Sequence, residues 1–264
     1  MGQPWCRLSR HDPATDLKEV WTMRVLPTNR RQFLQGLTAA GLAAFTTEGV
    51  FAQRLVETAA LGEGPFYPDK LPLDTDNDLL IVNDAITPGV GDITHLTGRV
   101  LTKSGQPMRN AFVEIWQVDN RGSYVHTGGR QPFGYDTNFQ GYGRFLSDAK
   151  GQYYFRTIKP IEYTLQGIFR TAHIHVAVSQ NGRRVFTSQI LVNGHPANAR
   201  DALSKRLEPA ALKTILVDFK PMPGSKLAEL SANFDIVLGS TVNELEPGAP
   251  RGTAPPMNRR PSGY

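Results

Sequence analysis

The sequence predicts an all-β protein, an immunoglobulin-like β-sandwich with long Pro/Gly-rich loops and little helix. Short apolar stretches rich in β-branched and aromatic residues recur from His95 onward. Turn signals separate these stretches at Lys103–Pro107, Asp119–Gly122 and Asp148–Gly151. The composition agrees, with 25 glycines and 19 prolines among 264 residues. Many short strands joined by regular turns are typical of a sandwich.

The first 52 residues are predicted to be an export signal of the twin-arginine (Tat) type. Adjacent arginines, Arg30 and Arg31, precede Leu34–Phe45, a mostly small and apolar stretch too short to span a bilayer. Small residues in Val50-Phe51-Ala52 suit a signal peptidase, so cleavage after Ala52 is expected. The alternative is a cytoplasmic amphipathic helix, but this segment lacks a polar face with helical period.

Two further expectations depend on this signal. Residues 1–22 fit no part of it, so Met23 is expected to be the true start. The one cysteine, Cys6, then lies outside the mature chain, which excludes disulfides, thiolate metal sites and cysteine nucleophiles there. The mature protein is predicted to be periplasmic or extracellular, without stable membrane insertion after cleavage.

One domain is predicted over residues 53–242, followed by a Pro/Gly-rich disordered tail at 243–264. Residues 53–94 are expected to form turns and extended chain. The net charge of +5 comes without a run of basic residues interleaved with aromatics, so no nucleic-acid partner is predicted. One short helix is expected at Ala197–Leu207. The predicted strands are Leu96–Thr102, Ala111–Val118, Gly151–Arg156, Ala172–Val178, Arg184–Val192, Thr214–Phe219 and Ala232–Leu238.

A pair of histidines marks the predicted strand Ala172–Val178. Ile174, Val176 and Val178 alternate with His173, His175 and Ala177, which is the period of a β-strand. Both imidazoles therefore project to one side, close enough to bind a single metal ion, while the other face is aliphatic core. Without other ligands, two surface or hydrogen-bonded histidines would explain the pattern equally well.

Two tyrosines and an arginine accompany the pair: Tyr124 beyond a Gly turn, Tyr163 beyond a strand end, and Arg170 before His173. With them the chain closely resembles the intradiol ring-cleavage dioxygenases, the family of protocatechuate 3,4-dioxygenase and catechol 1,2-dioxygenase. The resemblance spans roughly residues 61–240. The segments that carry it are Gly64-Pro-Phe-Tyr67, Val113-Glu-Ile-Trp-Gln117, Gly122-Ser-Tyr124, Phe155-Arg-Thr-Ile-Lys-Pro160, Tyr163, Arg170-Thr-Ala-His-Ile-His175 and Thr187-Ser-Gln189.

The resemblance implies that Tyr124, Tyr163, His173 and His175 bind one ferric ion, Fe(III). The donor set agrees, because Fe(III) is a hard cation that favours anionic oxygen. The resemblance also implies a catechol and O2 as substrates, with both oxygen atoms entering a muconate-type product. Tyr163 would be displaced when the catechol binds and would help to take up a proton, whereas Tyr124 would stay bound.

Further roles are implied around this centre. Arg170 is expected to stabilise negative charge that develops on the substrate, and Gln189 to line the same pocket. Pro65 and Phe66 are expected at the pocket mouth. Simpler alternatives are a surface salt bridge for Arg170, an ordinary strand residue for Gln189 and a plain turn around Pro65. Tyr142 is expected in a Gly-rich loop near the site.

There are three rival classes. A zinc hydrolase would need a third His or carboxylate and a catalytic base, and none is placed for it. A cupin-like Fe(II) oxygenase would need a carboxylate after the histidine pair, and residues 176–184 contain none. A noncatalytic exported sandwich of the carboxypeptidase-regulatory-like kind, which binds a ligand or protein, is the better explanation of the segments Gly105–Gln117 and Ser147–Phe155 taken alone. The substrate also stays open, because Tyr163 is followed by Thr164-Leu165-Gln166 where protocatechuate enzymes typically have Pro-Trp-Arg. Homo-oligomerisation is left undecided.

Overall fold

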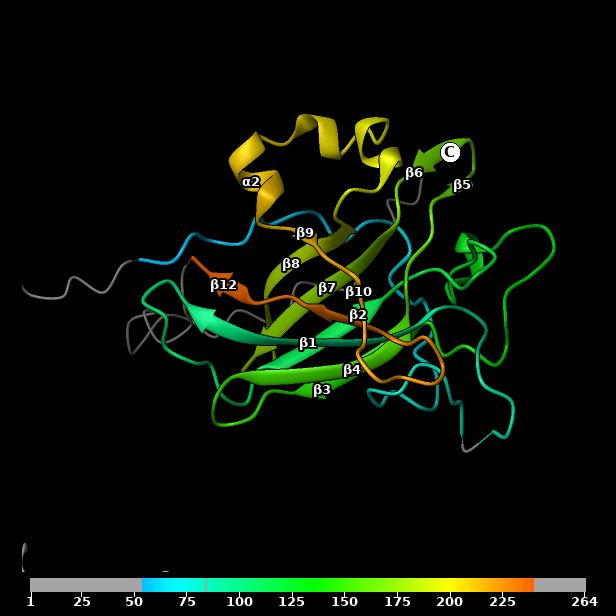
Figure 1. The fold of residues 1–264 in the computed structure, drawn as a ribbon, viewed down its shortest axis with the longest axis horizontal. Helices are drawn as coiled ribbons and strands as arrows, with labels where there is room; N and C mark the ends of the chain where they lie inside the picture. The colour runs from blue at the N-terminus through cyan, green and yellow to red at the C-terminus, as the bar shows by residue number, and fades with distance from the viewer. Residues whose placement is uncertain (1–53, 84, 240–264) are drawn as a thin grey trace, which may run out of the picture. The chain divides into compact units, whose positions relative to one another are not determined.

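The computed structural model describes residues 54–83 and 85–239. The predicted signal with Arg30, Arg31, Met23 and Cys6 lies outside the described residues, and so does the predicted tail at 243–264; these stay predictions (grey in Figure 1). None of the helices in the described ranges could span a bilayer.

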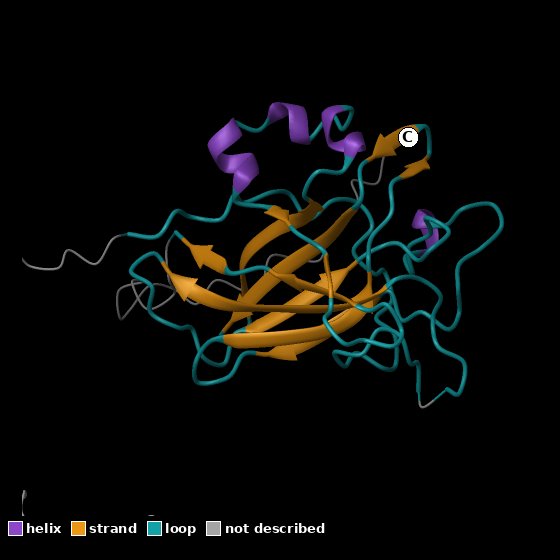
Figure 2. Cartoon of the chain, viewed as in Figure 1, coloured by secondary structure: helices purple, strands orange, loops and turns teal. Residues whose placement is uncertain are grey.

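Two five-stranded sheets and a two-stranded hairpin make up the described fold, so the predicted all-β sandwich is confirmed (Figures 1 and 2). In the first sheet, β1 (Ile93–Thr102) pairs antiparallel with β4 (Gln152–Ile158). On its other side β1 pairs in parallel first with β11 and then with β12. The short strands of this sheet are β10 (Lys220–Pro221), β11 (Leu230–Asn233) and β12 (Ile236–Leu238).

The second sheet has the order β3-β2-β7-β8-β9. Its central strand, β7 (His173–Gln180), pairs antiparallel with β2 (Phe112–Trp116) and with β8 (Arg183–Val192). The edge strands are β3 (Tyr142–Leu146) and β9 (Leu216–Val217). A central strand is hydrogen-bonded on both sides, so side chains on β7 have a fixed position.

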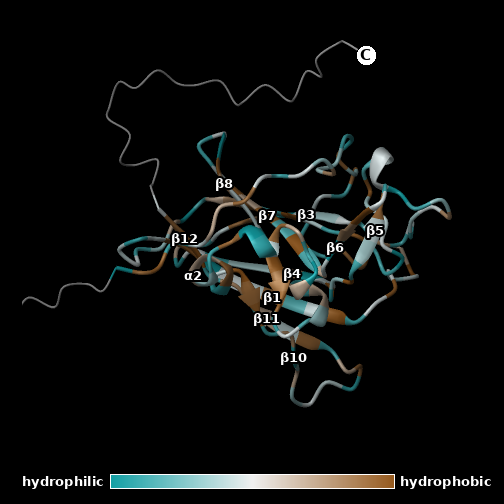
Figure 3. Cartoon of the chain, turned by 90° about the horizontal axis from the view of Figure 1, so that it is seen from above, coloured by the Kyte–Doolittle hydropathy of each residue, from teal (hydrophilic) through white to brown (hydrophobic). Residues whose placement is uncertain are grey.

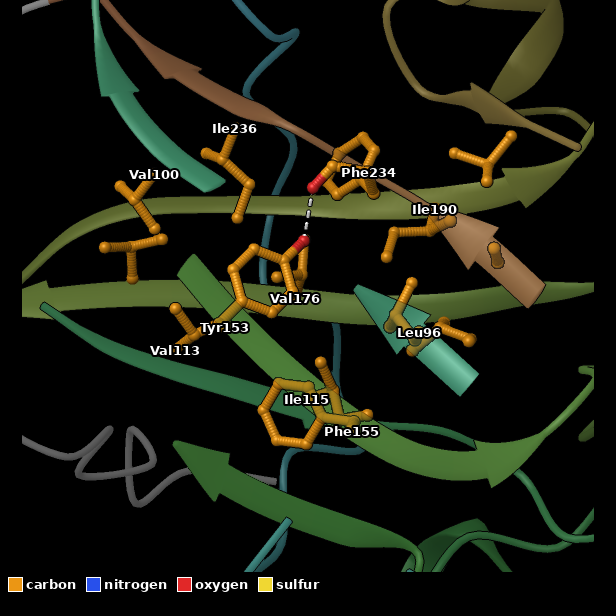
Figure 4. Close-up of a cluster of buried hydrophobic side chains, with 14 of the residues drawn as sticks. Leu96, Val100, Val113, Ile115, Tyr153, Phe155, Val176, Ile190, Phe234 and Ile236 are labelled. Carbon is orange, nitrogen blue, oxygen red and sulfur yellow. Dashed lines mark hydrogen bonds between the residues drawn. The ribbon is translucent and has the colours of Figure 1, made fainter. Parts of the chain in front are cut away.

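The core lies between the two sheets, where apolar side chains from both interdigitate (Figure 4). Figure 3 shows apolar residues concentrated on the strands around β1. The Tyr153 hydroxyl, buried in this core, donates a hydrogen bond of 2.5 Å to the Phe234 carbonyl oxygen. Tyr153 is thus a packing residue of the core. Fully buried members of the cluster include Leu96, Val100, Val113, Ile115, Phe155, Ile174, Val176, Ile190 and Ile236.

The helix predicted at Ala197–Leu207 is wrong. That segment forms two 3-10 turns, Pro196–Ala199 and Ser204–Arg206, and the α-helix is the later α2 (Pro209–Lys213). The Asp201 carboxylate accepts hydrogen bonds from two backbone N–H groups just beyond it, which starts a new turn there instead of continuing a helix.

Other differences concern short strands. Thr214–Phe219 contains only the two-residue β9, and Ala232–Leu238 is divided between β11 and β12. The strand β3 was not predicted, and Tyr142 begins this strand instead of lying in a loop.

A hairpin beyond β4 was also not predicted. Its strands β5 (Tyr163–Leu165) and β6 (Ile168–Arg170) pair antiparallel, with Tyr163 directly opposite Arg170. The two turn residues, Gln166 and Gly167, have φ values of 52° and 76°. Positive φ at both central positions is the requirement of the two-residue type I′ hairpin turn. This turn fixes the register that brings Tyr163 and Arg170 side by side.

Candidate metal centre

Two buried histidines on the central strand β7 form the base of the site. His173 and His175 are 0% and 2% exposed, and their Nε2 atoms lie 3.2 Å apart. Ile174 and Val176, which alternate with them, belong to the core between the sheets. The alternation of the sequence therefore corresponds to two faces of one strand, with both imidazoles on the face away from the main core.

The two imidazoles are held differently. His173 Nδ1 lies 2.6 Å from the Thr171 carbonyl oxygen, so Nδ1 carries the proton and Nε2 keeps its lone pair. The His175 ring instead stacks on Trp116, with centroids 4.8 Å apart and planes inclined by 8°. Gly64 covers its other edge, because a Cβ atom on Gly64 would lie 3.2 Å from His175 Cε1.

Two tyrosine hydroxyls complete the cluster. Tyr124 Oη lies 2.9 Å from Tyr163 Oη, 3.2 Å from His173 Nε2 and 3.0 Å from His175 Nε2. Tyr124 follows a turn in which Gly122 has a φ of 80°. A Cβ atom there would lie 3.0 Å from the Tyr163 Cβ atom, so glycine lets the two tyrosines approach.

The spacing of these atoms suits one metal ion. Ligand atoms bound at roughly 2.0–2.1 Å to one ion lie about 2.9–3.4 Å from one another. The four separations described above, from 2.9 to 3.2 Å, fall in that range. No group of three or more His, Cys, Asp or Glu side chains suited to a metal occurs within the described residues. A metal at this point would thus be held by phenol oxygen and imidazole nitrogen, a donor set that fits a hard ion such as Fe(III).

Burial controls the protonation of all four groups. Burial raises the pKa of Tyr124 and, less strongly, that of Tyr163, while the Arg170 charge acts in the opposite direction on both. Burial lowers the pKa of His173 to about 3 and that of His175 well below its ordinary value. The imidazoles are therefore neutral and able to bind a metal, and the phenols keep their protons until a cation offsets the cost of a buried phenolate.

Arg170 and Gln189 meet beside the cluster. Arg170 Nη2 donates to Gln189 Oε1 at 2.6 Å, and Gln189 lies directly opposite His175 in the β7–β8 pairing. Arg170 Nε donates to Asp201 Oδ2 at 2.8 Å. The Asp201 side chain is 0% exposed, so this ion pair is not on the surface. Asp201 was not predicted from the sequence, because its partner Arg170 lies 31 residues earlier in the chain.

The residues expected at the pocket mouth differ in their contacts. The Phe66 ring stacks on the Tyr124 ring at 5.2 Å, and lies 5.8 Å from the His126 ring. Pro65 lies exposed in the same turn. Phe66 thus covers one side of the Tyr124 phenol, and Pro65 lies in the turn that presents Phe66.

A buried polar network behind Trp116 was also missed. The carboxylate of Glu114 accepts hydrogen bonds from Tyr142 Oη at 2.6 Å, Tyr67 Oη at 2.9 Å and Arg184 Nη2 at 2.8 Å. The Tyr67 ring packs edge-on against Trp116 at 5.0 Å. Tyr142 packs in one buried cluster with Trp116, Tyr124 and Tyr163, so it lies near the site as expected, but its hydroxyl binds Glu114.

Substituting alanine for Gly64 is expected to weaken both the fold and the metal centre. Gly64 has a φ of 79°, a conformation that costs other residues about 1–2 kcal/mol. The added methyl would also displace the His175 ring that it would contact at 3.2 Å. We expect the free energy of unfolding to fall by about 1–2 kcal/mol, measured by urea denaturation, and ferric affinity to fall in a metal titration.

Gly62→Ala is the matched control, because a Cβ atom on Gly62 would meet nothing within 4 Å. Equal losses of ferric affinity in the two variants would show that the close approach to His175 is unimportant.

Comparisons with known proteins identify relatives of this chain. Residues 62–240 match the family model described as Dioxygenase. The protocatechuate 3,4-dioxygenase beta chain of Burkholderia cepacia is 35% identical over 174 residues, covering 63% of this chain and 72% of that protein. Catechol 1,2-dioxygenase 2 of Acinetobacter lwoffii is 31% identical over 203 residues, covering 67% and 70%. Among solved structures, the dioxygenase domain of a dioxygenase carbohydrate-binding protein fusion from Streptomyces sp. SirexAA-E has a TM-score of 0.53 at 26% identity, covering 70% of this chain and 100% of that one.

Proposed function

The chain belongs to the intradiol ring-cleavage dioxygenases, and from this membership we propose that it binds Fe(III) and inserts both atoms of O2 into a catechol-type ring, giving a muconate-type product. One observation carries the proposal: Tyr124 Oη lies within 3.2 Å of Tyr163 Oη and of both histidine Nε2 atoms, which are themselves 3.2 Å apart. Family membership also favours an enzyme over the noncatalytic binding sandwich.

The four side chains would hold the ion in unequal ways. His173 and His175 lie on a strand that is paired on both sides, and Tyr124 is 0% exposed beneath Phe66. Tyr163 is 7% exposed and lies on the two-stranded hairpin, outside the main sheets. Tyr163 is therefore the ligand with the most freedom to turn aside for a substrate oxygen, and its Oη would take up a substrate proton as it does so. When bound, the ferric ion would supply a Lewis acid that favours ionised catechol oxygens.

Arg170 and Gln189 would stabilise charge on the substrate ring. The guanidinium places a fixed positive charge beside the cluster, where it favours negative charge that develops on the ring during attack by O2. Gln189 orients that cation by accepting its Nη2 hydrogen bond at 2.6 Å. Phe66 and Trp116 flank the centre with apolar surface, which limits the access of water and strengthens these electrostatic effects.

The proposal is tested with ferric-reconstituted protein and a panel of catechol, protocatechuate and hydroxyquinol. We expect one iron per chain, a visible absorption band from tyrosinate-to-iron charge transfer, and a shift of that band when a catechol is added. Mass spectrometry after turnover under labelled dioxygen should show two labelled oxygen atoms in the product. A reconstituted protein that stays colourless, or one that binds iron and turns over none of these compounds, would overturn the proposal.

Export is a separate part of the proposal. The support is the twin-arginine pattern at Arg30 and Arg31 followed by the apolar stretch Leu34–Phe45. The enzyme would fold and take up its metal before crossing the membrane, and would act on plant- or lignin-derived catechols outside the cytoplasm. Cell fractionation of a producing strain checks this, with an Arg30→Lys, Arg31→Lys variant that should stay in the cytoplasm.

A further inference from the structure

The segment between β8 and α2 packs against the β5–β6 hairpin, and Figure 1 shows the two beside each other. We call residues 195–206 the brace. The Arg200 guanidinium lies 4.6 Å from the centre of the Phe169 ring and 3.6 Å from a carboxylate oxygen of Glu162. Thr171 Oγ1 donates to Asn198 Oδ1 at 2.7 Å. The brace thus contacts the chain on both sides of Arg170.

Asp201 lies at the centre of the brace and is 0% exposed. Its Oδ1 accepts hydrogen bonds from Leu203 N at 3.0 Å and from Ser204 N at 2.9 Å. Its Oδ2 accepts from Arg170 Nε at 2.8 Å and from Thr171 N at 3.1 Å. Burial alone would raise the pKa of Asp201, but these hydrogen bonds and the Arg170 charge lower it overall, so the carboxylate is ionised. One oxygen fixes the carboxylate in the brace, and the other points to Arg170.

Two contacts on different nitrogens determine the plane of the Arg170 guanidinium. Nε is held by Asp201, and Nη2 is held by Gln189 at 2.6 Å. A planar guanidinium held at two of its edges cannot rotate about its long axis. The Gln189 contact alone would leave that rotation free.

The orientation of the Arg170 guanidinium matters because this cation lies next to the candidate centre. Arg170 lies directly opposite Tyr163 in the β5–β6 pairing, and Gln189, which accepts from Arg170 Nη2, lies directly opposite His175 in the β7–β8 pairing. The guanidinium therefore lies beside side chains of the candidate centre.

We propose that Asp201 is a positioning residue of the ring-cleavage reaction. Its carboxylate holds the Arg170 guanidinium in the orientation in which the guanidinium stabilises negative charge on the substrate ring. This inference rests on the proposed function for its effect on catalysis. The Asp201–Arg170 contact itself can be tested without catalysis. A second role is structural, since Asp201 also binds the backbone of Thr171, whose carbonyl accepts from His173 Nδ1. The experiment has to separate the two roles.

Asp201→Asn is the informative substitution. All described contacts of the carboxylate are with donors, on both oxygens, so an amide must turn its own NH2 toward one of the two donor sets. Asn198→Ala is the matched control, because it removes a brace contact to Thr171 that does not involve Arg170. Arg170→Gln supplies the second arm of a double-mutant cycle.

The first readout needs neither iron nor substrate. In the metal-free protein, the Arg170 Nε–H signal in a nitrogen–proton NMR spectrum, assigned by its loss in Arg170→Gln, should exchange slowly with solvent. Asp201→Asn should move this signal to the position of solvent-exposed arginines, and Asn198→Ala should leave it unchanged. An unchanged signal in Asp201→Asn would overturn the inference, whether or not the wild-type protein opens any catechol.

The second readout uses the iron-loaded enzyme with catechol. Asp201→Asn should lower kcat by about 10- to 100-fold, the range expected for a misplaced catalytic group, and keep the tyrosinate band. Asn198→Ala should stay within about threefold of wild type, and adding Asp201→Asn to Arg170→Gln should cause no further loss. A further loss in the double variant, or loss of the band in Asp201→Asn, would show that Asp201 acts through the fold and overturn the inference. If the wild-type enzyme opens no catechol, the proposed function fails, and the NMR result still decides on the contact.

Discussion

Replacing Tyr124 with phenylalanine is expected to remove most of the intensity of the visible tyrosinate-to-iron band. It should also lower the rate of ring cleavage by about 10²- to 10³-fold. The substitution removes one oxygen atom, the one that lies within 3.2 Å of Tyr163 Oη and of both histidine Nε2 atoms. The ring can remain packed against Phe66, so the fold should persist. Absorption spectra of ferric-reconstituted protein and oxygen consumption with catechol measure the two effects.

Tyr153→Phe is the matched control for this substitution. Tyr153 is also a buried tyrosine, but its hydroxyl donates to the Phe234 carbonyl in the core between the sheets. Its removal should lower the free energy of unfolding by about 1–3 kcal/mol, because a buried carbonyl loses its partner. The iron spectrum should not change. If Tyr124→Phe retained the wild-type band and rate, the assignment of Tyr124 as a ligand would be wrong.

Gly98→Ala is expected to have the largest effect on stability among the glycine substitutions considered. A Cβ atom on Gly98 would lie 1.9 Å from the Phe234 carbonyl oxygen and 2.7 Å from Tyr153 Oη. β1 and the chain between β11 and β12 cannot both keep their places, since Phe234 N also donates to the Thr97 carbonyl at 2.8 Å. We expect a loss of about 3 kcal/mol or more, above the usual range for overpacking. For a domain of this size, that lowers Tm by about 6–12 °C.

Differential scanning calorimetry of the two glycine variants Gly98→Ala and Gly62→Ala measures this effect against a site where an added Cβ meets nothing within 4 Å. A Gly98→Ala protein that melts within about 2 °C of wild type, less than 1 kcal/mol, would contradict the close approach of Phe234 to β1.

Local patterns predicted the parts of the fold that depend on neighbouring residues. The alternation from His173 to Val178 defines both faces of β7, and the structure has the imidazoles on one face and the aliphatic side chains in the core. The tyrosines could not be placed by such reasoning. Tyr124 and Tyr163 come from a loop and a hairpin, and only the resemblance to a family associated them with the histidines.

Long-range polar contacts account for what the sequence did not reveal. Asp201 is 31 residues from Arg170 along the chain, in a stretch with the composition of a helix. The capping bonds of Asp201 divide this stretch into turns, and this same geometry directs its second oxygen to Arg170. The glycines around Tyr142 predict a loop, yet this segment forms β3 because it pairs antiparallel with β2. Propensity is a weak guide when a neighbouring strand provides the hydrogen bonds.

The hairpin that pairs Tyr163 with Arg170 also fixes how many residues separate them in the sequence. A two-residue turn between two three-residue strands requires that the facing end residues be seven positions apart, as 163 and 170 are. Lengthening the tip by one residue would change the turn type and shift one strand's side chains to the opposite face. The spacing Tyr-x6-Arg, with glycine at the fourth intervening position, is therefore a testable signature for recognising uncharacterised chains built in this way, even where overall identity is low.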